Sequence, residues 1–235
     1  MALSKADKQR WDEIDEMIFG AKDELKAAPD HTTLRQWAED NGMDNGPDFG
    51  KFKSSLRKIG VDYNSLREET IKERDAALLE QAQEMEMNAE GLPFIQLECA
   101  AVEQDDEASF AITDDEGTAL WFGRFSSKFE RIRKEGDLVS AEQSAADKAV
   151  YAAATARKAL GIDNIALWLT TSCPDLDEDS LRVAGARQGV ALSITVDQDA
   201  DKALFMAQMG GFRNLRDVPE TELAALVETE TDEEA

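Results

Sequence analysis

The sequence predicts an α+β protein in two parts, a small helical bundle followed by an α/β domain in which helices flank a mixed sheet. Two observations support this prediction. Apolar residues recur at helical spacing through residues 4–59, and from Phe94 onward short strand-like runs alternate with helical ones. The chain has 235 residues, 42% of them hydrophobic, which is enough for two cores. The expected boundaries are a bundle over 1–62, a long polar helix over 63–92, the α/β domain over 93–216 and an acidic tail over 217–235.

Three helices are expected in the bundle. Ser4 followed by Asp7 is a capping signal for the first helix, and Gly42 and Gly60 are stop signals for the second and third. The apolar spacing predicts helices over 4–20 or 4–27, over 32–41 and over 48–59. Short helices joined by tight turns predict a compact unit.

The second and third helices, joined by a turn over 42–47, have the outline of a helix-turn-helix. The third helix carries four basic residues: Lys51, Lys53, Arg57 and Lys58. In an acidic chain this local reversal of charge is the pattern expected of a helix that contacts phosphates. The alternative is that these cations form a solvated face and bridge to acids on adjacent helices.

Two charged segments flank the α/β domain. The helix over 63–92 has few apolar residues and is interpreted as a rigid linker or a dimer contact. The tail over 217–235 contains no Lys or Arg and is expected to be disordered after Val227. Such a tail could bind a partner as a peptide or cover the basic residues of the same chain.

The α/β domain shows a change of hydrophobic period in a definite order. Three strand-like runs come first, then helices and strands alternate. The expected strands are 94–102, 108–113, 119–125, 165–170 and 190–196, and the expected helices are 141–160, 176–188 and one that begins at Ala200. The acids and glycine at 114–117 predict a hairpin turn.

A second basic segment follows the third expected strand. Lys128, Arg131, Arg133 and Lys134 surround two apolar residues, Phe129 and Ile132. Alternating basic and apolar residues suit contact with a nucleic-acid backbone, but a short amphipathic turn packed on the sheet has the same pattern.

Composition limits the classes of function. The formal net charge of −24 makes the average surface repel phosphate and anionic membranes, so any contact with DNA or RNA must use a local basic patch. Cys99 and Cys173 lie too far apart in sequence for a zinc ribbon or a C-x-x-C redox motif. No signal peptide and no membrane-spanning run is present, so a cytoplasmic location is expected.

The order of three meandering strands followed by helix, strand, helix, strand and helix resembles the ribonuclease H-like superfamily of nucleases and transposases. The resemblance implies a cluster of carboxylates that holds two Mg²⁺ ions, with acids in the first strand, the first long helix, the end of the fourth strand and the last helix. The matching positions are Glu98, then Asp147 in preference to Glu142, and Asp201. At the end of the fourth strand Thr171 stands where an aspartate is expected, and its hydroxyl lacks the charge of a carboxylate.

Three functions are therefore expected, in this order. The first is a nucleic-acid-associated protein whose ribonuclease H-like domain is catalytically degenerate and acts as a binding or assembly platform. The second is an acidic interaction module for a basic protein partner. The third is a Mg²⁺-dependent nuclease that uses Glu98, Asp147 and Asp201. The sequence has no G-x-x-x-x-G-K-S/T, G-x-G-x-x-G or G-x-S-x-G motif to indicate other chemistry.

Overall fold

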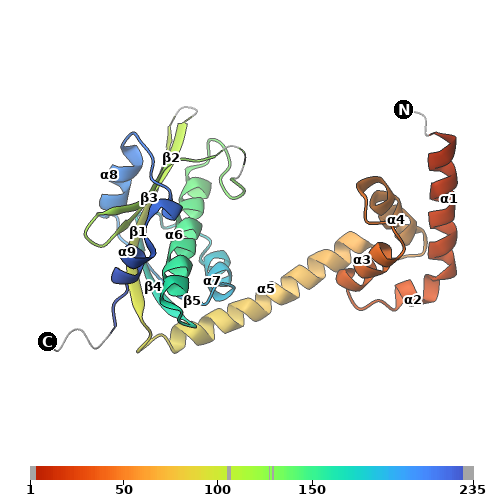
Figure 1. The fold of residues 1–235 in the computed structure, drawn as a ribbon, viewed down its shortest axis with the longest axis horizontal. Helices are drawn as coiled ribbons and strands as arrows, with labels where there is room; N and C mark the ends of the chain where they lie inside the picture. Colours follow the sequence, from red (N-terminus) through yellow and green to blue (C-terminus); the bar gives the residue numbers. More distant parts are fainter. Residues whose placement is uncertain (1–3, 105–106, 127, 129, 230–235) are drawn as a thin grey trace. The chain divides into compact units, whose positions relative to one another are not determined.

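The structure is a computed structural model that describes residues 4–104, 107–126, 128 and 130–229. It divides into two compact units, residues 1–76 and residues 77–235, with the boundary inside one long helix, α5 (Tyr63–Met87). Helices and a mixed sheet are both present (Figure 1), so the predicted α+β class is confirmed.

The first unit is helical. Its helices are α1 (Lys5–Gly20), α2 (Lys22–Lys26), α3 (His31–Asp40), α4 (Gly46–Lys58) and the first part of α5. The expected capping box is present, because the Ser4 side chain accepts from the Asp7 N–H and the Asp7 side chain accepts from the Ser4 N–H. The first predicted helix is interrupted at Ala21, whose backbone leaves the helical region, so α1 and α2 are separate.

The core of this unit is apolar and aromatic. Phe52 and Leu56 of α4 are fully buried against Ile14 and Ile18 of α1 and Leu34 of α3. These residues lie at the helical spacing noted in the sequence, which explains why each helix buries one face.

The second unit is built on a five-stranded sheet. Its strands are β1 (Phe94–Gln104), β2 (Glu107–Asp114), β3 (Ala119–Arg124), β4 (Ile165–Thr171) and β5 (Val190–Val196), in the order β3-β2-β1-β4-β5. β1 pairs antiparallel with β2 and parallel with β4, and β4 pairs parallel with β5. The antiparallel meander of β1, β2 and β3 is therefore joined through β1 to the parallel strands β4 and β5.

Helices cover the sheet on both faces (Figure 1). α6 (Leu138–Leu160) and α7 (Glu178–Ala186) pack on the face that carries Ile95, Leu97 and Cys99 of β1. On this face the buried side of α6 consists mainly of alanines, which lets the helix approach the strands closely. α8 (Lys202–Gln208) packs on the opposite face, over β1, β2 and β3.

The close approach of α7 to the sheet depends on one glycine. A Cβ atom added at Gly185 would lie 2.7 Å from the carbonyl oxygen of Val190, so no larger residue fits without a backbone shift. This contact positions α7 against the start of β5.

The C-terminal segment forms short helical elements before Val227. A 3₁₀ turn (Leu215–Asp217) and α9 (Glu220–Ala225) fold onto the second unit, and the backbone of Glu228 pairs with that of Phe94. The apolar residues Val218 and Leu223 are buried in the core and anchor this segment. The part of the predicted disordered tail after Thr229 lies outside the described residues.

Candidate functional site

Glu98, the predicted first-strand carboxylate, is used to fix a helix. It is 7% exposed, and its Oε1 accepts a hydrogen bond of 2.8 Å from the backbone N–H of Ala203 near the start of α8. Side chains alternate along a strand, so Glu98 lies on the α8 face and Cys99 on the α6 face. The free-energy cost of burying this charge is thus offset by a backbone donor.

Asp201 lies beside Glu98. Both line a hollow of about 270 Å³ between β1, the end of β4 and the loop after β5. Asp115, Asp197 and Asp199 also line this hollow, together with the cation Lys202. The structure therefore brings two of the three predicted carboxylates to one place.

Asp147, the third predicted carboxylate, is not brought there. It lies on α6, which packs on the opposite face of the sheet from Glu98. Burial raises its pKa, an effect that Lys148 partly offsets and Glu130 adds to. The predicted set of Glu98, Asp147 and Asp201 is consequently divided between the two faces.

A different set of polar residues meets on the α6 face, where β1, α6 and the end of β4 come together. Glu142 is 5% exposed, and Cys99 and Thr171 are buried beside it. The Thr171 hydroxyl accepts a hydrogen bond of 3.2 Å from the Cys173 N–H. We call Cys99, Glu142 and Thr171 the buried polar cluster.

The electrostatics of the buried polar cluster follow from its burial. Burial raises the pKa of Glu142 to about 7, and the backbone N–H of Ala101 only partly offsets this. Burial also raises the pKa of the Cys99 thiol, and the neighbouring Glu142 adds to the effect. Within the described part of the chain, Oε2 of Glu142 has no hydrogen-bond partner.

The sequence contained a signal for Glu142. Glu142, Ala145, Ala146 and Ala149 follow the i, i+3, i+4, i+7 spacing of one helix face, and the three alanines belong to the apolar run that α6 buries. Asp147 lies off this spacing. Asp147 was preferred for its position along the helix, and that position does not determine the direction in which its side chain points.

The basic residues of α4 are partly neutralised within the bundle. Asp15 of α1 accepts hydrogen bonds from Lys51, Ser55 and Lys58. Burial alone would raise the pKa of Asp15, but these hydrogen bonds lower it to about 2. The prediction that cations of this helix bridge to acids on adjacent helices is thus met by Lys51 and Lys58.

The other two cations of α4 do not contact Asp15, and Arg57 is exposed while Lys53 is half-buried. Nζ of Lys53 lies 5.4 Å from the ring centre of Phe49, and Nε of Arg57 lies 3.4 Å from a carboxylate oxygen of Asp62 at the surface. An exposed pair of this kind contributes little to stability, so Arg57 can exchange its partner.

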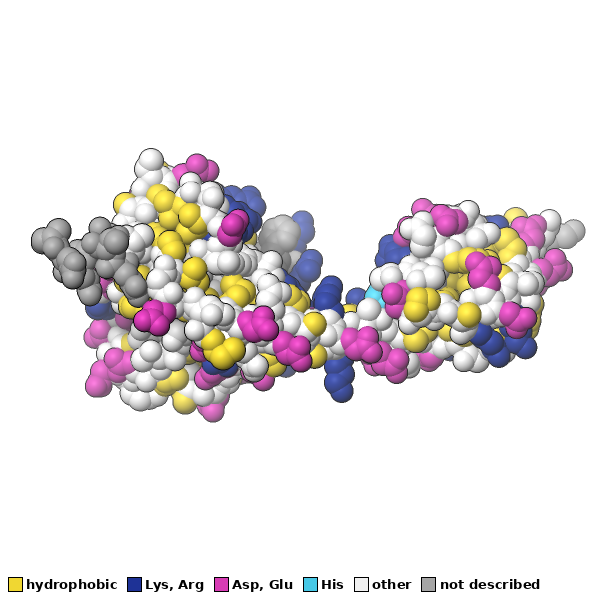
Figure 2. Space-filling view, turned by 90° about the horizontal axis from the view of Figure 1, so that it is seen from below, with side chains coloured by type: hydrophobic (Ala, Val, Ile, Leu, Met, Phe, Trp, Pro, Cys, Tyr) yellow, Lys and Arg dark blue, Asp and Glu magenta, His cyan; other side chains and the backbone are white. Residues whose placement is uncertain are grey.

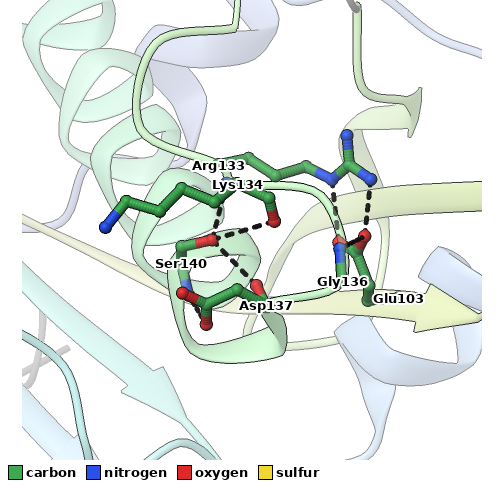
Figure 3. Close-up of polar contacts among 6 residues, drawn as sticks. All are labelled: Glu103, Arg133, Lys134, Gly136, Asp137 and Ser140. Carbon is green, nitrogen blue, oxygen red and sulfur yellow. Dashed lines mark hydrogen bonds and ion pairs between the residues drawn. The ribbon is translucent and has the colours of Figure 1, made fainter.

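Arg133, in the second basic segment, makes a structural contact. Its guanidinium donates two hydrogen bonds, of 2.8 and 2.6 Å, to the carboxylate of Glu103 in β1 (Figure 3). Glu103 also accepts from the Gly136 N–H, and the Ser140 hydroxyl accepts from the Lys134 N–H. These bonds tie the segment to β1 and to the start of α6.

Lys128, Arg131 and the Lys134 side chain are exposed. Phe129, the apolar residue predicted to lie among them, falls outside the described residues. Figure 2 shows, for the face in view, acidic side chains spread over the surface and Lys and Arg side chains in smaller groups.

Comparisons with known proteins assign no family to this chain. No protein-family model matches it, and no curated protein matches it significantly. Among the described residues, no helix is long and apolar enough to cross a membrane.

Proposed function

We propose that the second unit is a ribonuclease H-like domain without nuclease chemistry, and that the protein acts as a binding platform. The β1–β2–β3 meander and the parallel β4 and β5, connected through α6 and α7, support this proposal. The order of elements along the chain is the one on which the resemblance rests.

The observation that carries the proposal is the composition of the buried polar cluster. It draws on the first strand, the first long helix and the end of the fourth strand, which are the places where the resemblance implies carboxylates. On the α6 face these places hold a thiol, Cys99, a hydroxyl, Thr171, and one acid, Glu142, whereas Glu98 and Asp201 lie on the α8 face. A pair of Mg²⁺ ions needs several anionic oxygen ligands, so this set of donors does not fit them.

Substitution provides a direct test. The double variant Cys99→Asp/Thr171→Asp places carboxylates beside Glu142 and is expected to gain affinity for Mn²⁺ or Mg²⁺ that the parent chain lacks, measured by calorimetry. Adding Glu142→Gln should remove the gained affinity, because it removes one of the three ligands. Mg²⁺-dependent cleavage of an RNA–DNA hybrid by the parent chain would refute the proposal.

The charges indicate the class of partner. Lys51, Lys58 and Arg133 are engaged by carboxylates of the same chain, while the hollow beside α8 concentrates acids. With a net charge of −24, the surface attracts cations and repels phosphates. A basic protein partner is therefore better supported than DNA or RNA.

Nucleic-acid binding by α4 remains a second candidate because of Lys53 and Arg57. In a helix-turn-helix-like pair formed by α3 and α4, these side chains would contact phosphates. Lys53→Glu/Arg57→Glu should then abolish salt-sensitive binding of labelled DNA or RNA without unfolding the bundle. Lys72→Glu/Arg74→Glu on α5 is the matched control. Equal binding by all three proteins would exclude α4 as the contact.

A further inference from the structure

The α8 face of the sheet is covered over only part of its width. α8 packs on β1, β2 and β3, whereas on β4 and β5 the same face exposes Trp168, Ser193 and Thr195. Strand register places these residues in two rows, Gln96–Trp168–Ser193 and Glu98–Thr170–Thr195. The uncovered strip is thus continuous with the strand residues that line the hollow.

The strip is centred on a preorganised aromatic surface. Trp168 is 46% exposed, and its ring stacks on Phe94 with the ring centres 4.2 Å apart and the planes at 18°. Stacking fixes the orientation of the indole, which stays partly exposed. A fixed, exposed tryptophan face is a favourable contact for an arginine or lysine side chain.

Acids border the same strip. Glu98, Asp115, Asp197, Asp199 and Asp201 line the hollow at the end of the row that contains Thr170. Asp197, Asp199 and Asp201 are exposed. Lys202, the one cation among the described residues that line the hollow, donates a hydrogen bond to the backbone carbonyl of Asp115. A positive side chain placed on Trp168 would therefore have anionic oxygens nearby.

We infer that this surface, Trp168 with the acid-lined hollow, is a docking site for an arginine- or lysine-bearing segment of a protein partner. The inference rests on the proposed role as a binding platform and locates that role on the molecule. Charge complementarity selects the occupant, since a nucleic-acid strand would bring phosphates against the acids. The C-terminal residues of this chain, which are acidic after Val227 and contain no Lys or Arg, would be repelled in the same way.

The experiment uses the full-length chain and a fluorescent peptide of repeated Arg-Gly, with a Gly-Ser peptide and a single-stranded oligonucleotide as comparison probes. Fluorescence anisotropy at low salt is expected to show binding of the Arg-Gly peptide alone, weakening as salt rises. Trp168→Ala should weaken it about threefold by removing the cation–π contact. Asp197→Asn/Asp199→Asn/Asp201→Asn should weaken it about tenfold.

A matched variant separates the site from the overall charge. Glu68→Gln/Glu69→Gln/Glu73→Gln makes the same change in net charge on exposed positions of α5 and should leave affinity within about twofold. If this control loses as much affinity as the triple aspartate variant, the docking site is wrong, while the platform role for a basic partner stands. If the parent chain does not bind the Arg-Gly peptide, or binds the oligonucleotide more tightly, both are overturned.

Discussion

The two faces of the sheet show how one set of strands serves two purposes. On the α6 face, Ile95, Leu97 and Cys99 of β1 join an apolar core lined by the alanines of α6. On the α8 face, the alternate residues Gln96 and Glu98 lead from the exposed Trp168 to the acid-lined hollow. Because successive side chains point to opposite faces, the core and the proposed docking site are built from neighbouring residues.

The two faces each bury one glutamate. Glu98 and Glu142 are 7% and 5% exposed, yet their surroundings differ. A carboxylate oxygen of Glu98 accepts from the Ala203 N–H beside the open hollow. Burial raises the pKa of Glu142 to about 7, and one of its carboxylate oxygens has no hydrogen-bond partner among the described residues. Burial without full hydrogen bonding therefore brings the pKa of Glu142 close to neutral pH.

The largest expected effect comes from removing the ionisation of Glu142. Its folded pKa of about 7 lies above the ordinary 4.5, so the folded chain binds more protons than the unfolded chain between these values. The contribution of Glu142 to stability is fully present below pH 4.5 and is lost as the pH rises through 7. For such a shift the free energy of unfolding falls by about 3 kcal/mol. Glu142→Gln should abolish this loss, as measured by urea unfolding from pH 5 to pH 8.5.

Asp15 provides an internal contrast for that titration. Its pKa is lowered to about 2, so its contribution is present at neutral pH and is lost only in strong acid. Asp15→Asn should leave the slope between pH 5 and pH 8.5 unchanged. A parent chain whose stability does not fall over this range would show that Glu142 is ionised or solvated in the folded state.

The next effect tests how tightly the α6 face is packed. Ala149 of α6 is fully buried in the core, so Ala149→Leu must displace α6 from the sheet. Overpacking of this kind costs about 2 kcal/mol, and the shift should also perturb Glu142. Lys158→Leu, at an exposed position of the same helix, should change stability by no more than about 0.5 kcal/mol. The measurement is the midpoint of chemical unfolding, and equal values for the two variants would contradict close packing.

Hydrophobic period was sufficient to predict the class of fold, but it could not place the site. The change from helical to strand spacing near Phe94 predicted the five strands, because burial of one face imposes that pattern directly. Glu98 was singled out because a charge in an apolar strand must have a partner. That partner is a backbone N–H of α8, which no side-chain pattern reveals.

The sequence also could not predict which residues far apart in the chain become partners. The sequence showed Lys51 and Arg133 as basic residues, but not that Asp15 and Glu103 engage them. The acids of the hollow likewise come from three parts of the chain, namely β1, the β2–β3 turn and the loop after β5. In a chain with 50 Asp and Glu residues, composition cannot indicate which of them become neighbours.

The smallest expected effect concerns the α8 face, where Glu98 fixes the start of α8. Glu98→Ala leaves the buried Ala203 N–H without its acceptor and should cost about 1 kcal/mol. Glu98→Gln keeps an oxygen acceptor and relieves repulsion from the nearby acids, so its cost should be smaller. Hydrogen exchange of the α8 amides is the measurement, with the α6 amides as reference. Faster exchange confined to α8 in Glu98→Ala would show that this carboxylate positions one helix beside the proposed docking site. Equal acceleration in α6 would mean that the two faces of the sheet are energetically coupled through β1. The core and the docking surface would then not be independent of each other.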